Sequence, residues 1–193
     1  MASIDKRTER RDTSAIWRVG VRQVVYMALG AALYGALSFL TNFLQLPSVG
    51  QVSVRPAIVI PLFFGAVFGP VVGFFVGGVG NFIGDYISGY GVYWNWDLGN
   101  ALIGLIAGLA LYGTFGVYSS RRPITFAEIA SAIGIIVGIG FAAYTDIWVS
   151  KLNFGGASSE FLPAAISDLI FGLILLPILL VAYNAAVRQR GRG

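Results

Sequence analysis

Residues 56–87 read PAIVIPLFFGAVFGPVVGFFVGGVGNFIGDYI, and the division of this apolar stretch decides the fold. A helix needs about 20 apolar residues to cross the roughly 30 Å hydrocarbon core of a bilayer. Other apolar runs lie near residues 24–46, 98–118, 126–149 and 162–187. If one helix covers most of 56–87, the chain has five spans. A turn at Gly69-Pro70 instead gives separate helices over 56–68 and 70–87, and six spans in all.

The lysines and arginines decide between five spans and six. They form three clusters, at residues 6–22, at Arg121 and Arg122, and at residues 188–192. Such clusters stay in the cytoplasm, so an even number of spans must separate consecutive clusters. Six spans satisfy this rule, with four and then two between clusters, and leave only Arg55 and Lys151 on outer loops. The sequence therefore predicts an all-α integral membrane protein with six transmembrane helices and both termini in the cytoplasm.

Composition agrees with a membrane protein and excludes several kinds of chemistry. Hydrophobic residues make up 56% of the chain and charged residues 11%, against about 45–50% and about 25% in an average soluble domain. The absence of Cys and His excludes thiolate zinc sites, disulfides and Ser-His-Asp triads. We expect no catalytic residue, metal or cofactor. The formal charge of +4 indicates membrane orientation, and no nucleic-acid binding is expected.

The same features predict a single domain. We expect one six-helix membrane domain over residues 1–193, in which 1–21 form a short basic cytoplasmic segment and 188–193 a basic cytoplasmic tail.

Aspartates near the outer ends of the predicted helices are the first candidate site residues. Asp85 ends the third helix, Asp97 opens the fourth, and Asp146 is near the end of the fifth. Glu160 and Asp168 flank the start of the sixth, with Asp168 about two turns inside. Ionisable groups in membrane helices usually face a bundle interior or a wet cavity. Helix capping or a place at the water interface explains the first three aspartates equally well, so Asp168 is the strongest candidate.

Aromatic and amide side chains surround these aspartates. Residues 88–97 read SGYGVYWNWD, and Asp97 and Asn100 share a helix face at a spacing of three. Tyr144 and Trp148 share another at a spacing of four. An aromatic wall with convergent polar groups suits a flat, polar-edged heterocycle, although aromatic residues at a membrane boundary also form the interfacial belt. The candidate binding residues here are Asn95, Trp96, Asp97, Asn100, Tyr144, Asp146 and Trp148.

Small residues recur every four positions on the first helix, at Ala28, Ala32 and Ala36. Such a strip lets another helix pack closely. Judged by spacing alone, a contact within the chain is the favoured interpretation, and a partner protein is the alternative.

Several motifs together resemble one transporter family. They are RPAIVIP at residues 55–61, FGPVVG at 68–73, GNFIGD at 80–85 and WNWDLGN at 94–100. With the alanine strip, the six helices and the cytoplasmic termini, the chain resembles the substrate-binding S components of energy-coupling factor (ECF) transporters over residues 24–187. The resemblance is to the riboflavin-type and uncharacterised branches.

The resemblance implies a receptor in a prokaryotic plasma membrane that captures a vitamin or related micronutrient from the outer face. A separate transmembrane coupling subunit and two ABC-type ATPases would drive import. The sequence has no GxxxxGK[ST] phosphate-binding loop of its own. In similar proteins the alanine strip docks on the coupling subunit, which implies that role for Ala28, Ala32 and Ala36. The outer ends of helices four to six would form the pocket.

The substrate and the mechanism stay open at this point. Outer aspartates favour a cationic or amine-bearing ring such as thiamine or its aminopyrimidine, paired with Asp168 and stacked on Trp96 or Trp148. Arg55 opposes this inference, because its guanidinium could neutralise an aspartate or bind an anionic group, so a neutral flavin remains an alternative substrate. A stand-alone proton-coupled carrier using Asp168 or Asp85 is the alternative function. A membrane enzyme with paired carboxylates fits less well, because no two acids share a helix face.

Overall fold

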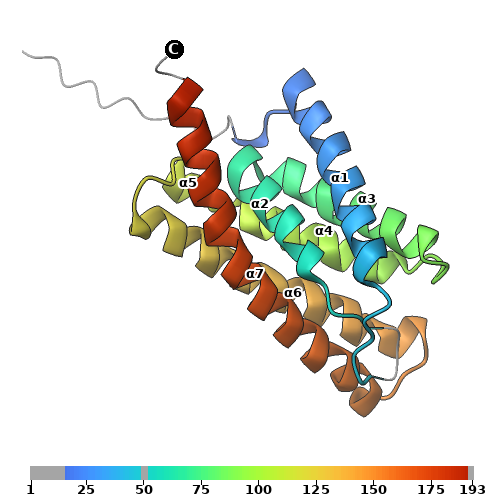
Figure 1. Cartoon of the computed structure of the whole chain (residues 1–193). Helices are drawn as coiled ribbons and strands as arrows, with labels where there is room; N and C mark the ends of the chain where they lie inside the picture. Colours follow the sequence, from blue (N-terminus) through green and yellow to red (C-terminus); the bar gives the residue numbers. More distant parts are fainter. Residues whose placement is uncertain (1–15, 49–51, 191–193) are drawn as a thin grey trace, which may run out of the picture.

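The computed structural model describes residues 16–48 and 52–190, and within these ranges it is helical apart from an isolated bridge between Gln45 and Ser53 (Figure 1). The elements are α1 (Val21–Thr41), the 3-10 helix η2 (Pro56–Ile58), α2 (Val59–Phe68), α3 (Pro70–Ile87), α4 (Trp94–Gly108), α5 (Leu111–Thr114), α6 (Arg121–Val149) and α7 (Phe154–Arg190). Residues 1–15 of the predicted basic segment and 191–193 of the predicted tail lie outside the described ranges.

The division at Gly69-Pro70 is confirmed. In the described part of the chain five helices are long and apolar enough to cross a membrane, and the shorter apolar helix Pro56–Phe68 is the sixth. Gly69 has a φ of 114°, which a residue with a side chain rarely adopts. Pro70 then starts α3, where its missing N–H is not needed. The predicted all-α, six-helix architecture therefore holds.

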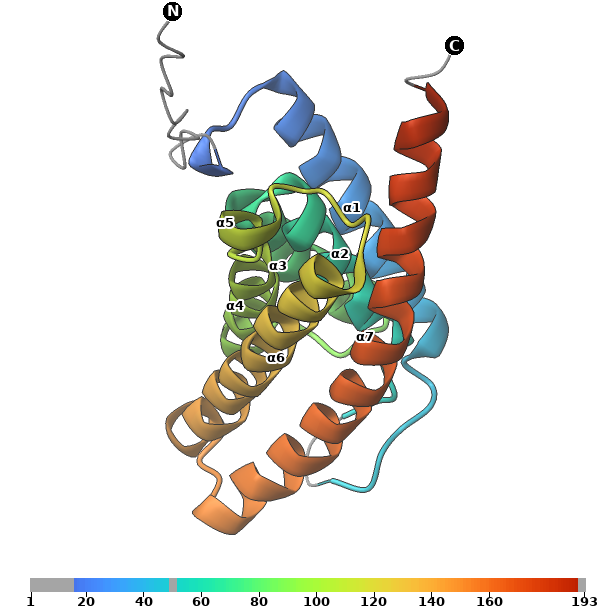
Figure 2. The same cartoon turned by 90° about the vertical axis from the view of Figure 1, so that its left-hand side faces the viewer.

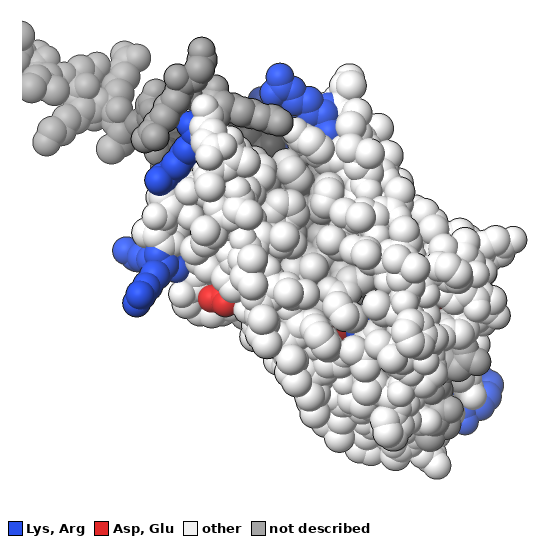
Figure 3. Space-filling model, in the orientation of Figure 1, with Lys and Arg blue, Asp and Glu red and all other residues white. Residues whose placement is uncertain are grey.

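Basic side chains gather toward one end of the bundle. In Figure 2, α1 and α6 begin and α7 ends toward the same end, while the α6–α7 turn lies at the other. Figure 3 shows most visible Lys and Arg side chains toward the first end. This arrangement has the even number of crossings that the charge clusters require. The cytoplasmic assignment of that end stays a prediction.

The last helix begins eight residues earlier than predicted. Its start at Phe154 is fixed by Asn153, whose Oδ1 accepts a 2.8 Å hydrogen bond from the Gly156 N–H. Pro163 lies inside α7 without ending it, as membrane helices tolerate. The prediction that Glu160 and Asp168 flank a helix start is therefore wrong, because both lie inside α7.

Other helix ends also differ from the prediction. The helix α4 begins at Trp94 instead of residue 98, α6 begins at Arg121 instead of 126, and α1 ends at Thr41 instead of 46. Hydropathy alone does not count a polar first turn as helix, and so it places the starts of α4 and α6 too late.

Glycines let α3 and α4 touch through their backbones. A Cβ placed on Gly104 would lie 2.0 Å from the Gly73 carbonyl oxygen, and one on Gly77 would lie 2.1 Å from that of Asn100. Only glycine fits such an approach. The contact brings the polar end of α3, with Asn81 and Asp85, against the start of α4.

The alanine strip on α1 is exposed on the surface of the described bundle. Ala28, Ala32 and Ala36 are exposed, whereas α1 packs inward through a different face that includes Ala31 and Tyr34. The contact within the chain that the spacing favoured is not seen, and the strip is left free for another molecule.

Candidate functional site

A cavity of about 330 Å³ lies toward the end of the bundle that carries the α6–α7 turn. This volume falls within the usual range for small-molecule sites. The walls come from the end of α1, the segment before η2, the α3–α4 region, the end of α6 and the start of α7. The lining residues are Asn42, Val52, Ser53, Arg55, Asn81, Asp85, Tyr90, Tyr93, Trp96, Asp146, Ser150, Leu152 and Glu160.

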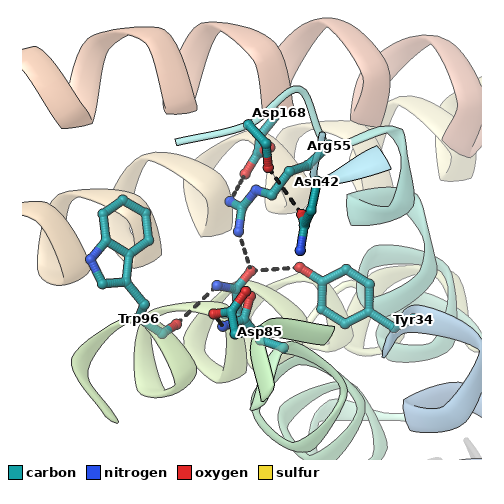
Figure 4. A network of polar contacts seen from close by, with 9 residues as sticks. Tyr34, Asn42, Arg55, Asp85, Trp96 and Asp168 are labelled. Carbon is teal, nitrogen blue, oxygen red and sulfur yellow. Dashed lines mark hydrogen bonds and ion pairs between the residues drawn. The ribbon is translucent and has the colours of Figure 1, made fainter. Parts of the chain in front are cut away.

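A buried ion pair lies at the base of this cavity. Arg55 Nη2 donates to Asp168 Oδ2 at 2.5 Å, and the two side chains are 9% and 0% exposed (Figure 4). Burial alone would lower the pKa of the Arg55 guanidinium, but Asp168, together with Tyr34 and Asp85, outweighs burial and raises that pKa above its ordinary value. The guanidinium therefore stays charged, and Asp168 supplies the charge that compensates it.

Asn100 ties this ion pair to α1 and α4. Its Oδ1 accepts hydrogen bonds from the Tyr34 hydroxyl at 2.8 Å and from Arg55 Nη1 at 3.4 Å. Its Nδ2 donates to the Trp96 carbonyl at 2.9 Å. Tyr34, Asn100 and Asp168 are each 0% exposed. The network thus joins α1, the segment before η2, α4 and α7 beneath the cavity.

A second polar cluster holds two of the predicted aspartates. Asn81 Nδ2 donates to Asp85 Oδ2 at 2.9 Å and to Asp97 Oδ1 at 3.0 Å. Asp85 lines the cavity, whereas Asp97 lines a separate apolar groove between α3 and α4. One amide therefore links two carboxylates, of which only one faces the candidate site.

Two more carboxyl groups line the cavity from α6 and α7. Asp146 accepts hydrogen bonds from Trp96 Nε1 at 2.7 Å and from the Ser150 hydroxyl at 2.6 Å. Glu160 is 5% exposed, and its Oε2 has no hydrogen-bond partner. Burying an acceptor without a partner is costly. The Oε2 atom of Glu160 is therefore an acceptor in the cavity wall that lacks a donor. The same carboxyl group also interacts with the neighbouring Asp146 carboxyl group.

Besides Asp97, three predicted binding residues lie away from the cavity. Asn95 is buried and donates to the Ala142 carbonyl at 3.0 Å, which joins α4 to α6. Tyr144 stacks on Phe154, with ring centroids 5.5 Å apart, and Trp148 is 70% exposed.

Helical geometry explains why the predicted aromatic wall is not part of the cavity. Successive residues turn by about 100°, so Tyr144 and Trp148 each point about 160° away from Asp146. Because Asp146 faces the cavity, both rings point away from it.

Several residues of the site were not among the predicted binding residues. Glu160 was noted only as flanking a helix, and Arg55 only as an outer-loop charge of open role. One sequence feature could have identified Asn81 and Tyr34 as site residues. Each places a polar group on a helix face that otherwise carries small and apolar residues. Tyr90, whose hydroxyl donates to the Asn42 carbonyl at 2.5 Å, closes one side of the cavity.

Comparisons with known proteins agree with the family that the sequence motifs resemble. A family model described as "ECF-type riboflavin transporter, S component" matches residues 18–185. A UPF0397 protein of Aliivibrio salmonicida (strain LFI1238) is 32% identical over 133 residues, which cover 66% of this chain and 71% of that relative.

The ion pair predicts a specific pattern of stability. Asp168→Asn removes the charge that compensates Arg55, and we expect the melting temperature in detergent to fall by roughly 6–12 °C, because a buried uncompensated charge costs about 3 kcal/mol. Arg55→Met combined with Asp168→Leu removes both charges and should recover most of this loss. Tryptophan fluorescence during heating measures all three. A double variant that melts below Asp168→Asn would contradict the pairing.

Proposed function

We propose that this chain, which belongs to the family of ECF-type riboflavin transporter S components, captures a vitamin-like heterocycle in the cavity above Arg55 and passes it to a separate coupling module. Membership of the family makes the chain a substrate-specific receptor, a transporter subunit and not an enzyme. It is a multi-pass protein of the prokaryotic plasma membrane. The substrate and the partner subunits are the parts that we propose.

The unpartnered Oε2 atom of Glu160 is the observation that carries the proposed site. A buried acceptor in a cavity wall gains free energy when a ligand supplies its missing donor. Trp96 lies beside it in the wall, held by its hydrogen bond to Asp146, and offers an aromatic edge to a ring. We therefore expect a ligand whose N–H or ammonium group meets Glu160.

The charge of the cavity favours a cationic or amine-bearing ring. Asp85, Asp146 and Glu160 line it together with one guanidinium, that of Arg55. The Arg55 charge is already matched by Asp168 beneath it. A cavity whose charged lining residues are mainly carboxyl groups attracts positive charge. The sequence suggested that Asp168 contacts the cationic ligand directly. Because Asp168 pairs with Arg55, we propose instead that it holds Arg55 in place.

A neutral flavin is the second candidate. The description of the matching family names riboflavin, and an imide N–H of a flavin can also donate to the Glu160 carboxylate. The two candidates differ in charge, so they respond differently to a neutral acceptor at position 160.

Glu160→Gln separates these candidates, because Gln still accepts a hydrogen bond but carries no charge. We expect thiamine, used as the cationic probe, to quench Trp96 fluorescence in the wild type and to bind more than about tenfold more weakly to Glu160→Gln. Glu128→Gln, on α6 outside the cavity lining, is the matched control and should bind as the wild type does. If riboflavin binds and thiamine does not, and if Glu160→Gln changes the affinity for riboflavin little, the result would favour the flavin and contradict the cationic substrate.

The exposed alanine strip supports a docking role on α1. Ala28, Ala32 and Ala36 present a flat face outward, and small residues at this spacing let a second helix approach closely. We propose that this strip receives the transmembrane coupling subunit, which acts with two ABC-type ATPases. The stand-alone carrier gains no support from Asp168, because the Arg55 guanidinium holds that carboxylate.

Ala32→Leu tests the docking role. The bulky side chain should keep the partner helix away, so that uptake in cells carrying the coupling module is lost while substrate binding to the purified chain is unchanged. Ala182→Leu, at an exposed position of α7, is the control and should transport normally. Uptake that persists in Ala32→Leu would exclude the strip as the docking surface.

A further inference from the structure

A second cavity, of about 570 Å³, lies at the opposite end of the bundle from the substrate cavity. It is bounded by the α5–α6 connection, the first turn of α6 and the last turns of α7. We call it the basic groove and define it by Arg121 and Ile124 of α6 and by Val181, Ala185 and Arg188 of α7. It shares no residue with the substrate cavity.

The groove is positively charged at its rim. Arg121 and Arg188 are exposed, and neither forms an ion pair with any residue that the structure describes. No acidic side chain is among the lining residues. The positive end of the α6 dipole lies here too, with no acidic residue in its first turn. Two guanidinium groups from two helices thus line one groove.

The inner walls of the groove are apolar and continue along the membrane-facing surface. Ile124, Val181 and Ala185 line the groove. Below them on α7, Ile178 and Ile174 are each 59% exposed and follow at helical spacing. An anion with a long apolar tail would match both the rim and this surface.

We propose that the basic groove binds an anionic phospholipid, with its phosphate between Arg121 and Arg188 and an acyl chain along Val181 and Ile178. Charge complementarity and the apolar path along a membrane-spanning helix select a lipid over a soluble anion. Basic pockets between membrane helices bind such headgroups, and each basic residue near the surface adds about 1 kcal/mol. The site is independent of the substrate proposed above.

Native mass spectrometry of the full chain, exchanged from detergent into phosphatidylglycerol or phosphatidylcholine, tests the proposal. We expect phosphatidylglycerol to be retained, and its affinity to fall about fivefold for each arginine replaced in Arg121→Gln and Arg188→Gln. Arg122→Gln is the matched control, because Arg122 is the adjacent exposed arginine and does not line the groove. Ala185→Leu fills the groove with every charge intact and should also displace the lipid.

Four results would overturn the lipid site. Equal loss in Arg122→Gln would mean diffuse surface attraction, and equal retention of phosphatidylcholine would mean a purely apolar contact. Displacement by free glycerol 3-phosphate at a comparable concentration would point to a soluble anion. Lipid binding unchanged in Arg121→Gln and Arg188→Gln, with loss of the coupling subunit during purification, would assign the groove to an acidic protein partner.

Discussion

The ion pair between Arg55 and Asp168 is the constraint on which the polar end of this protein depends. A guanidinium buried in a membrane protein needs a compensating charge, and the only described carboxylate bonded to it comes from α7, 113 residues away in sequence. The pair therefore fixes the segment before η2 against α7. Through Asn100 it also fixes Tyr34 of α1, so four separate parts of the chain meet beneath one cavity.

The pairing decides which charges are left for a ligand. Because Arg55 is matched from below, Asp85, Asp146 and Glu160 dominate the electrostatics of the cavity. The same network reaches α1 on its buried side, while the alanine strip lies on the exposed side of that helix. Tyr34 is thus the contact through which a change in the cavity could reach the proposed docking surface. Substrate binding and docking to the coupling subunit would therefore involve the buried and the exposed face of the same helix, α1.

Sequence patterns predict the helices far better than the site. Hydropathy and the positive-inside rule gave 56–68 and 70–87 with the observed bounds, since membrane spans are a local property of composition. Asp168 was the strongest candidate site residue, about two turns inside the predicted helix, but its partner Arg55 depends on tertiary packing that no local spacing contains. The face of Trp148 was predictable: it lies two residues from Asp146, so the two cannot both face the cavity. The start of α7 depended on capping by Asn153, which hydropathy does not measure.

A crystal structure of the chain with the ligand that it retains from its native membrane is the most direct test of this account. We predict that Arg55 stays bonded to Asp168 and that a nitrogen of the ligand donates to the Glu160 carboxylate. A ligand whose anionic or carbonyl group binds Arg55, with Asp168 released from the guanidinium, would contradict it.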